Sequence, residues 1–271
     1  MKTYAIYDDE MHSKEAIGYL FYYEKANEYI IELKEGIDEW DAPLLFQGIV
    51  KKNIYTVPKD AAALWVKERV IPSGRQNIGE ILKQAKMKEY NEMRLLALAK
   101  GICSQDSCCI EEISDDDLPE DIQKRRSKNV SDCFVSEDKQ IICLFKDNTV
   151  RKLDLNKLKE NNADILRILK SDDLLYSVKV GVGGYSISFH DTIEIPVDTI
   201  REKGVLLSVT ANDILGFART NIADTTKVCE MLECSRQNLS YLAKTGKLTP
   251  FICGTKENLY TKGEVEKLMC E

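Results

Sequence analysis

A short polar stretch near the end of the chain carries side chains suited to nucleic-acid recognition. Residues 235–244 read SRQNLSYLAK, and the apolar pair Leu239 and Leu242 sets the inward side of a predicted helix. Arginine can donate two hydrogen bonds to guanine, and glutamine or asparagine pairs similarly with adenine. Lysine side chains bind phosphates, and phosphate contacts position a protein on DNA without specifying the base sequence. The residue types therefore indicate contact with base edges and with the phosphate backbone.

The candidate DNA-contacting residues share polar side chains on or beside this helix. They are Thr226, Ser235, Arg236, Gln237, Asn238, Ser240, Tyr241, Lys244, Lys247, Lys256 and Asn258. We expect Arg236, with Gln237 or Asn238, to meet base edges because they occupy the first turn of the helix. Lys244, Lys247 and Lys256 are expected to face phosphates.

Two predicted helices and their caps would position these side chains. Asp224 or Thr225 can cap a first helix, and Ser235 can cap the second by accepting a backbone N–H from its first turn. Gly246 would end the second helix, because that position requires a left-handed residue. A tight turn therefore separates the two helices.

A hairpin and a last helix are predicted to follow. Residues 251–253 and 258–260 flank the sequence GTKE, which is typical of a small hairpin or wing. Thr261 and Glu264 form a capping-box pattern that opens a final helix. From Val205 onward eight basic and eight acidic residues balance, so DNA binding would depend on their placement and on salt.

This order of elements resembles the DNA-binding domains of the MerR and excisionase families. TTKVCEMLECSRQNLSYLAKTGKL matches the helix pair, and FICGTKENLYTKGEVEKL matches the wing and last helix, over about 45 residues. The resemblance implies a winged helix-turn-helix whose second helix enters the major groove. The wing departs from the family pattern because it offers Lys256 and Asn258 where arginine is usual.

The central part of the chain predicts a small α+β module over residues 132–204. Short apolar runs indicate strands, and one amphipathic stretch, 163–169, indicates a helix. The expected strands are 133–135, 141–145, 150–153, 176–180, 185–189 and 193–195. LFKDNTVRKLDLNKL (144–158) and YSISFHDTIEIPVDTIREKG (185–204) resemble the domain-of-unknown-function 2442 family. That family implies a module for regulation or partner binding.

The N-terminal part, residues 1–113, alternates strand-like and helix-like patterns and predicts an α+β module of unassigned function. Residues 111–121 hold seven acidic side chains and run into the basic sequence KRRSK. Such charge blocks are poor core material, so a charged linker is predicted over 114–131. The last predicted domain, 205–271, is the winged helix-turn-helix. The expected fold class is α+β and multi-domain.

Other groups that could do chemistry have simpler interpretations. Cys103, Cys108 and Cys109 lack the paired C-x-x-C spacing of a zinc site. His190 precedes an aspartate with no nucleophile nearby, which favours a turn histidine. The glycines of GVGG (181–184) lack the dinucleotide-binding pattern and favour a hairpin turn. We therefore predict no catalytic residues, no metal and no cofactor.

Composition sets the remaining expectations. The chain has 271 residues, 44% hydrophobic and 31% charged, with a net charge of −7. No apolar run is long enough for a membrane helix, and the nine cysteines suit a reducing cytoplasm. The prediction is a cytoplasmic DNA-binding regulator, antitoxin-like or autoregulatory.

We expect this regulator to bind double-stranded DNA as a homodimer and to reach a protein partner, toxin-like or other, through its N-terminal modules. One alternative is a protein-interaction adaptor whose helix-turn-helix does not bind DNA. A third is an enzyme within residues 1–113, where no catalytic constellation is recognisable.

Overall fold

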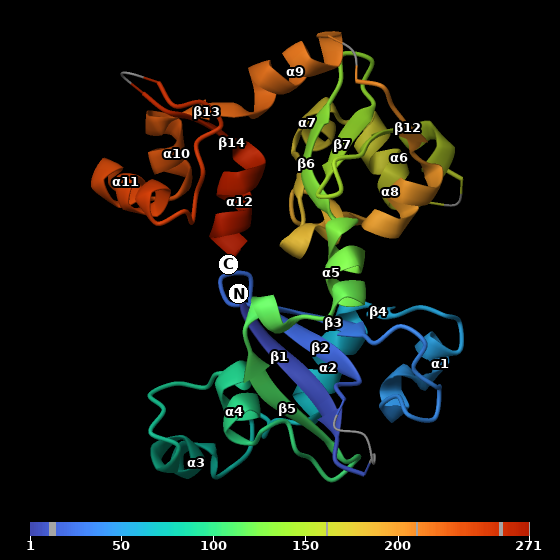
Figure 1. Ribbon diagram of the computed structural model, residues 1–271, viewed down its shortest axis with the longest axis vertical. Coiled ribbons are helices and arrows are strands. Elements are labelled where there is room, and N and C mark those ends of the chain that lie inside the picture. The colour runs from blue at the N-terminus through green and yellow to red at the C-terminus, as the bar shows by residue number, and fades with distance from the viewer. Residues whose placement is uncertain (11–14, 161, 210, 255–256, 271) are drawn as a thin grey trace. The chain divides into compact units, whose positions relative to one another are not determined.

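The chain folds into two compact units, Met1–Gln123 and Lys124–Glu271. The computed structural model (Figure 1) describes residues 1–10, 15–160, 162–209, 211–254 and 257–270, with side chains omitted for 211–215. The fold is mixed, with helices and antiparallel sheets in both units. This agrees with the α+β expectation at the level of fold class.

The first unit is built on one antiparallel sheet with the strand order β4-β3-β2-β1-β5. Its strands are β1 (Lys2–Asp8), β2 (Gly18–Tyr23), β3 (Glu28–Leu33), β4 (Thr56–Val57) and β5 (Cys108–Ile113). Tyrosine and β-branched residues in these runs favour the pleated conformation. Every residue of β2 is buried, so both faces of the sheet are covered at that strand.

Helices cover one face of this sheet and complete its core. They are η1 (Leu44–Phe46), α1 (Gln47–Val50), α2 (Lys59–Glu68) and α4 (Glu92–Leu98), whereas α3 (Ile78–Gln84) has no buried residue. Trp65 and Val66 of α2 and Leu96 of α4 pack in one cluster with Ile6 and Leu20 of the sheet. The chain then forms η2 (Asp115–Asp117) and α5 (Glu120–Ser127), which crosses the division between the two units.

A buried arginine ends α2. The Arg69 side chain is 1% exposed and lies over the Trp65 ring, 3.7 Å from its centroid. One Arg69 nitrogen donates to the Trp65 carbonyl at 3.2 Å, and another pairs with the Asp106 carboxylate. The helix ends at Glu68, with Arg69 as its C-terminal cap.

The second unit begins with two antiparallel sheets. The first has the order β12-β8-β7-β6 and consists of β6 (Val130–Val135), β7 (Ile141–Phe145), β8 (Val150–Leu153) and β12 (Val205–Leu206). The second has the order β11-β10-β9 and consists of β9 (Val178–Val180), β10 (Ser186–Phe189) and β11 (Ile193–Pro196). Apart from the start of β9, the predicted strands of the central module are confirmed to within a few residues.

Five short helical segments accompany these sheets. They are η3 (Leu155–Leu158), α6 (Ala163–Lys170), α7 (Asp172–Tyr176), η4 (Val182–Gly184) and α8 (Val197–Lys203). Asn162 caps α6 by accepting the Ile165 N–H at 3.2 Å, and Ile165 and Ile168 enter the core. The predicted helix over 163–169 is confirmed, whereas residue 176, expected in a strand, ends α7 instead.

The C-terminal part of this unit follows α9 (Ala211–Asn221). It contains β13 (Ile222–Asp224), α10 (Thr225–Met231), α11 (Arg236–Lys244), β14 (Leu259–Thr261) and α12 (Lys262–Cys270). β13 and β14 pair antiparallel, and a core of its own lies between them and the helices. Residues 114–131, the predicted linker, contain η2, α5 and the start of β6. The domain boundaries proposed from the sequence stay a prediction.

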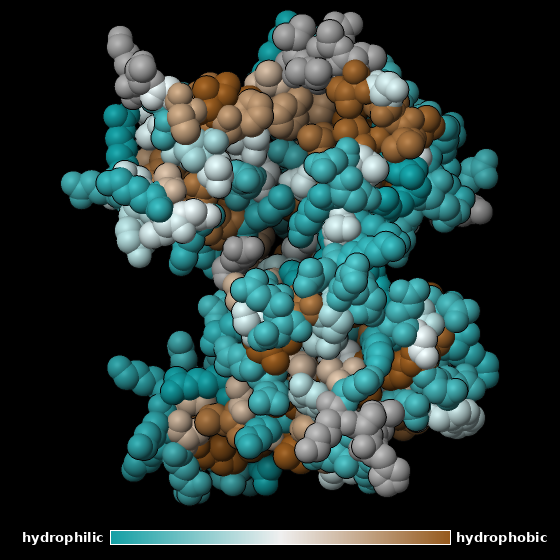
Figure 2. All heavy atoms as spheres, in the orientation of Figure 1, coloured by the Kyte–Doolittle hydropathy of each residue, from teal (hydrophilic) through white to brown (hydrophobic). Residues whose placement is uncertain are grey.

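Hydrophilic residues cover most of the face in Figure 2, and hydrophobic residues gather there in patches. One patch lies in the region of β12, where Val205 and Leu206 are 52% and 59% exposed. β12 is an edge strand, and such strands leave backbone hydrogen-bonding groups unpaired. Among the described helices, none has the length and apolar character that a membrane crossing requires.

We expect Asp106→Ala to destabilise the first unit by about 3–5 kcal/mol, because it leaves the buried Arg69 charge without its partner. Both tryptophans lie in this unit, so tryptophan fluorescence during urea unfolding measures the change. Glu15→Ala, which removes the exposed partner of Lys34 in the same unit, is the control and should leave the unfolding transition close to that of the wild type. Equal effects from the two substitutions would contradict the assignment.

Candidate functional site

The helix pair α10 and α11 carries most of the candidate contact residues, and side-chain caps fix where both helices begin. The Asp224 carboxylate accepts the Lys227 N–H at 2.8 Å. The Ser235 hydroxyl accepts the Asn238 N–H at 3.2 Å. Each cap satisfies a backbone donor that the first turn of a helix cannot pair internally. Both predicted caps are confirmed.

Both helices end in the same left-handed motif. At the end of α11, Gly246 has φ +72, and the Lys247 N–H donates to the Leu242 carbonyl at 3.0 Å. At the end of α10, Glu233 has φ +49, and the Cys234 N–H donates to the Cys229 carbonyl at 3.0 Å. This is the Schellman pattern. The α10 motif places a glutamate where a glycine carries less strain.

A small apolar core holds the pair together. Its fully buried members are Ala223, Val228, Leu239, Leu248, Tyr260 and Val265. Leu239 of α11 is 1% exposed, as the spacing of its helix predicts. Cys229 and Cys234 pack against this core, in agreement with their interpretation as small apolar groups.

The polar residues of α11 form one exposed face. Its exposed members are Arg236, Gln237, Asn238, Ser240, Tyr241 and Lys244, with Tyr241 at 61%. A guanidinium nitrogen of Arg236 donates to the Thr226 hydroxyl at 2.9 Å, which links the first turn of α11 to α10. This bond leaves the other guanidinium nitrogens of Arg236 available to a ligand.

The remaining candidates have different surroundings. Ser235 is committed to its cap, and Lys247 is exposed just beyond the end of α11. Asn258 is half-buried, and its carbonyl accepts a hydrogen bond from the Thr225 hydroxyl at 3.2 Å. Lys256 lies outside the described residues. Within the described part of the chain, Lys244 and Lys247 have no ion-pair partner.

The predicted hairpin is shorter than expected. In the described residues between Phe251 and Tyr260, its pairing is a single bridge between Ile252 and Leu259. Leu259 also begins β14, whose strand partner is β13. The chain therefore uses the second predicted strand mainly to close the helix pair against β13.

A buried carboxylate joins this part of the chain to the central module. Asp132 on β6 accepts the Cys133 N–H at 2.8 Å and the N–H of Gly263 in the first turn of α12. Its carboxylate is so close that a Cβ on Gly263 would lie 2.6 Å from the Asp132 carboxyl carbon. The favourable field at a helix N-terminus and the two N–H donors stabilise the carboxylate there.

Further contacts make the same junction. The buried Asn221 amide donates to the Cys133 carbonyl at 3.1 Å, and the Lys262 ammonium donates to the Thr220 carbonyl. Phe217 of α9 meets Phe134 of β6 edge to face, with ring centroids 5.5 Å apart. These contacts fix α9 and α12 on β6.

Burial raises the pKa values of two acidic side chains at this junction. It raises the pKa of Glu266 to about 7, with the Asp132 charge adding to the rise and Lys179 and Lys262 opposing it. Burial raises the pKa of Asp132 to about 6, although N–H donors and the Lys267 and Lys262 charges oppose the shift. Both carboxylates therefore cost stability in their charged forms.

Sequence reasoning missed this junction. Asp132 looks like an ordinary polar residue beside a strand, and Asn221 like an ordinary helix end. The available signal was Gly263, a glycine within the first turn of a predicted helix, where glycine is unfavourable without a packing reason.

Elsewhere, the structure shows no group of three or more His, Cys, Asp or Glu side chains within its described residues that could hold a metal. His190 lies in a turn with φ +46, and its exposed ring contacts the Asp173 carboxylate at 3.1 Å. Cys108 is buried, and burial raises the pKa of its thiol to about 12.

Comparisons with known proteins add no relative. A scan against protein-family models found no match, and searches of curated proteins and of solved structures found none either.

We expect Glu233→Gly to stabilise the helix pair by about 0.5–1 kcal/mol, because glycine adopts the left-handed conformation without a steric penalty. Gly246→Ala, at the corresponding position of α11, should destabilise by about the same amount. Amide hydrogen exchange in α10 and α11 measures both changes. The same sign of effect at the two positions would contradict the shared motif.

We also expect the second unit to lose stability as the pH rises from 5 to 8. Glu266 has a raised pKa in the folded state, so between these pH values the folded chain binds more protons than the unfolded chain. Glu266→Gln should flatten this dependence and stabilise the unit at pH 8, by on the order of 1–3 kcal/mol. Far-UV circular dichroism in urea measures the transition.

Glu264→Gln is the matched control for this pH prediction, because Glu264 is exposed on the same helix. It should leave the pH dependence unchanged. A wild-type stability that rises between pH 5 and 8 would contradict the expected sign.

Proposed function

We propose that the protein is a DNA-binding transcriptional regulator and that its C-terminal part is a winged helix-turn-helix that inserts α11 into the major groove. The observation that carries the proposal is the continuous exposed polar face of α11 on a helix whose two ends are fixed. A rigid helix with polar groups at its N-terminal turn is what base readout requires.

Arg236 has the central role in this proposal. Its bond to Thr226 fixes the side chain at the first turn of α11, and its other nitrogens can donate to a guanine. Lys244, in the last turn, and Lys247, just beyond it, are placed to contact phosphates. The sum of local charge is small, so binding depends on this placement and weakens with salt.

In this proposal, the rest of the chain mediates dimerisation or binds a partner protein. A single small module makes few phosphate contacts, so a homodimer bound to two half-sites gives useful affinity. The first unit and the central module would bind a protein partner or mediate self-association, in an antitoxin-like or autoregulatory setting.

One observation favours a different function, a protein-interaction adaptor. Tyr241 on α11 is 61% exposed, and Phe251 and Ile252 are 57% and 50% exposed. Aromatic and aliphatic groups of this kind are typical of protein interfaces. In the adaptor, the helix pair binds protein and has no affinity for DNA.

Fluorescence anisotropy with DNA from upstream of the protein's own coding sequence tests the proposal. Arg236→Ala should weaken binding by about 1–3 kcal/mol and relax preference at one base position. Lys244→Ala should weaken binding to all sequences alike and lower the salt slope by about one. Lys170→Ala, a change in the last turn of α6, is the matched control and should leave binding unchanged.

Stability measurements separate binding from folding in this experiment. Leu239→Ala removes a buried side chain and should destabilise the helix pair by about 2–5 kcal/mol, whereas the Arg236 and Lys244 variants should melt like the wild type. If the wild type shows no DNA binding at low salt, or binds as well without Arg236 and Lys244, the adaptor function replaces the regulator.

A further inference from the structure

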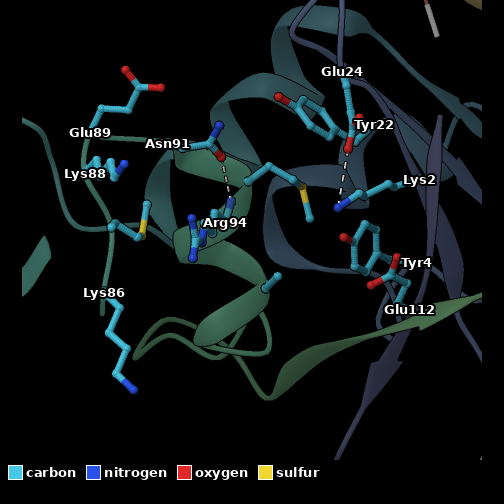
Figure 3. Close-up of a pocket in the computed structure, with 13 residues that line it drawn as sticks. Lys2, Tyr4, Tyr22, Glu24, Lys86, Lys88, Glu89, Asn91, Arg94 and Glu112 are labelled. Carbon is cyan, nitrogen blue, oxygen red and sulfur yellow. Dashed lines mark hydrogen bonds and ion pairs between the residues drawn. The ribbon is translucent and has the colours of Figure 1, made fainter. Parts of the chain in front are cut away.

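A pocket of about 810 Å³ opens in the first unit, far in sequence from the helix pair. Figure 3 shows side chains of the sheet on one side of it and side chains of α4 and the preceding loop on the other. Its size falls in the range of small-molecule sites. Nothing in the proposed DNA contact uses it.

Two tyrosines form the sheet side of the pocket. In the strand register Tyr4 lies opposite Glu112 on β5, and Lys2 lies opposite Tyr22 on β2, so these residues share one face. Tyr4 is only 3% exposed, and its hydroxyl has no hydrogen-bond partner among the described residues. A tyrosine hydroxyl is protonated at neutral pH and can donate, and burial and the Glu112 charge raise the pKa of Tyr4 further, to about 12.

The sheet side of the pocket is acidic. Lys2 and Glu24 pair at 3.3 Å and cancel each other. Glu112 has no ion-pair partner in the described residues, so one negative charge remains there.

The opposite side is basic. Lys86, Lys88 and Arg94 line it together with one acid, Glu89. None of the three cations has an ion-pair partner in the part of the chain that the structure describes. The pocket therefore has a positive side and a negative side, with Met87 and Met93 among its apolar residues.

We propose that this pocket binds a small zwitterion of the amino-acid type, with an apolar or aromatic side chain. The ligand carboxylate pairs with Arg94, and its ammonium pairs with Glu112. The Tyr4 hydroxyl donates a hydrogen bond to the ligand, whose side chain packs against Tyr22 and Met93.

Charge complementarity selects this class of ligand over singly charged ones. A ligand with only a negative charge would pair with Arg94 and leave Glu112 without a partner. A ligand with only a positive charge would pair with Glu112 and leave Arg94 without one. Methionine and tyrosine side chains give the apolar part of the ligand adaptable and aromatic surfaces. Free amino acids and short peptides share this chemistry, and the experiment distinguishes them.

Isothermal titration calorimetry of the full chain tests the proposal, with L-phenylalanine and L-leucyl-L-phenylalanine as the two probes. We expect saturable binding of at least one, and the stronger binder identifies the source. N-acetyl-L-phenylalanine lacks the ammonium and L-phenylalanine amide lacks the carboxylate, and the corresponding blocked dipeptides serve for the second probe. Each blocked form should bind at least about tenfold more weakly than its parent.

The variants connect each ligand group to its residue. Arg94→Gln and Glu112→Gln should each weaken binding at least about tenfold, and Tyr4→Phe should weaken it several-fold. N-acetyl-L-phenylalanine should bind the Glu112→Gln variant as tightly as it binds the wild type, because it lacks the ammonium that pairs with Glu112. Arg75→Gln and Glu80→Gln, exposed on the same unit away from the pocket, are the matched controls and should bind like the wild type.

Two results would overturn the proposal. One is the absence of heat for both probes at millimolar concentration. The other is binding that survives Arg94→Gln and Glu112→Gln unchanged. Because the titration contains no DNA, neither result bears on the proposed regulator function, and failure of DNA binding does not bear on this pocket.

Discussion

The contact between the Asp132 carboxylate and the first turn of α12 determines how the C-terminal helices are attached to the central sheet. The carboxylate accepts the Gly263 N–H, and no side chain larger than hydrogen fits at that glycine. A buried carboxylate is stable only with such donors, so the helix end must lie against β6. Asn221 and Phe217 add a hydrogen bond and a ring contact to the same strand.

This attachment leaves α11 outside the junction. The buried residues of α12 and β14, Val265 and Tyr260, pack on the inner side of α11 through Leu239. The apolar side of α11 packs in this core, so its polar side faces solvent. A helix presented in this way can meet a groove or a partner surface without rearrangement, and the energetic cost of binding is lower for it.

Local signals determine much of this architecture. Caps at Asp224 and Ser235 and the glycine at 246 define the two helices, because each satisfies backbone groups within a few residues. Apolar runs identify the central strands for the same reason, since alternation and turn residues act over short distances. The predicted hairpin is reduced to one bridge between Ile252 and Leu259, and the pairing of β14 with β13 joins residues that lie far apart in the sequence.

The sequence by itself determined most strands of the central module, the beginnings of α10 and α11, the end of α11 at Gly246, and the residue types on the face of α11. Only the tertiary structure decided that Asp132 meets Gly263, that the half-buried Glu266 lies near Asp132, and that Arg94 and Glu112 face one pocket. The physical reason is the separation along the chain of the residues that interact. Caps and periodicity act between neighbours, whereas burial and long-range pairing depend on residues brought together by folding.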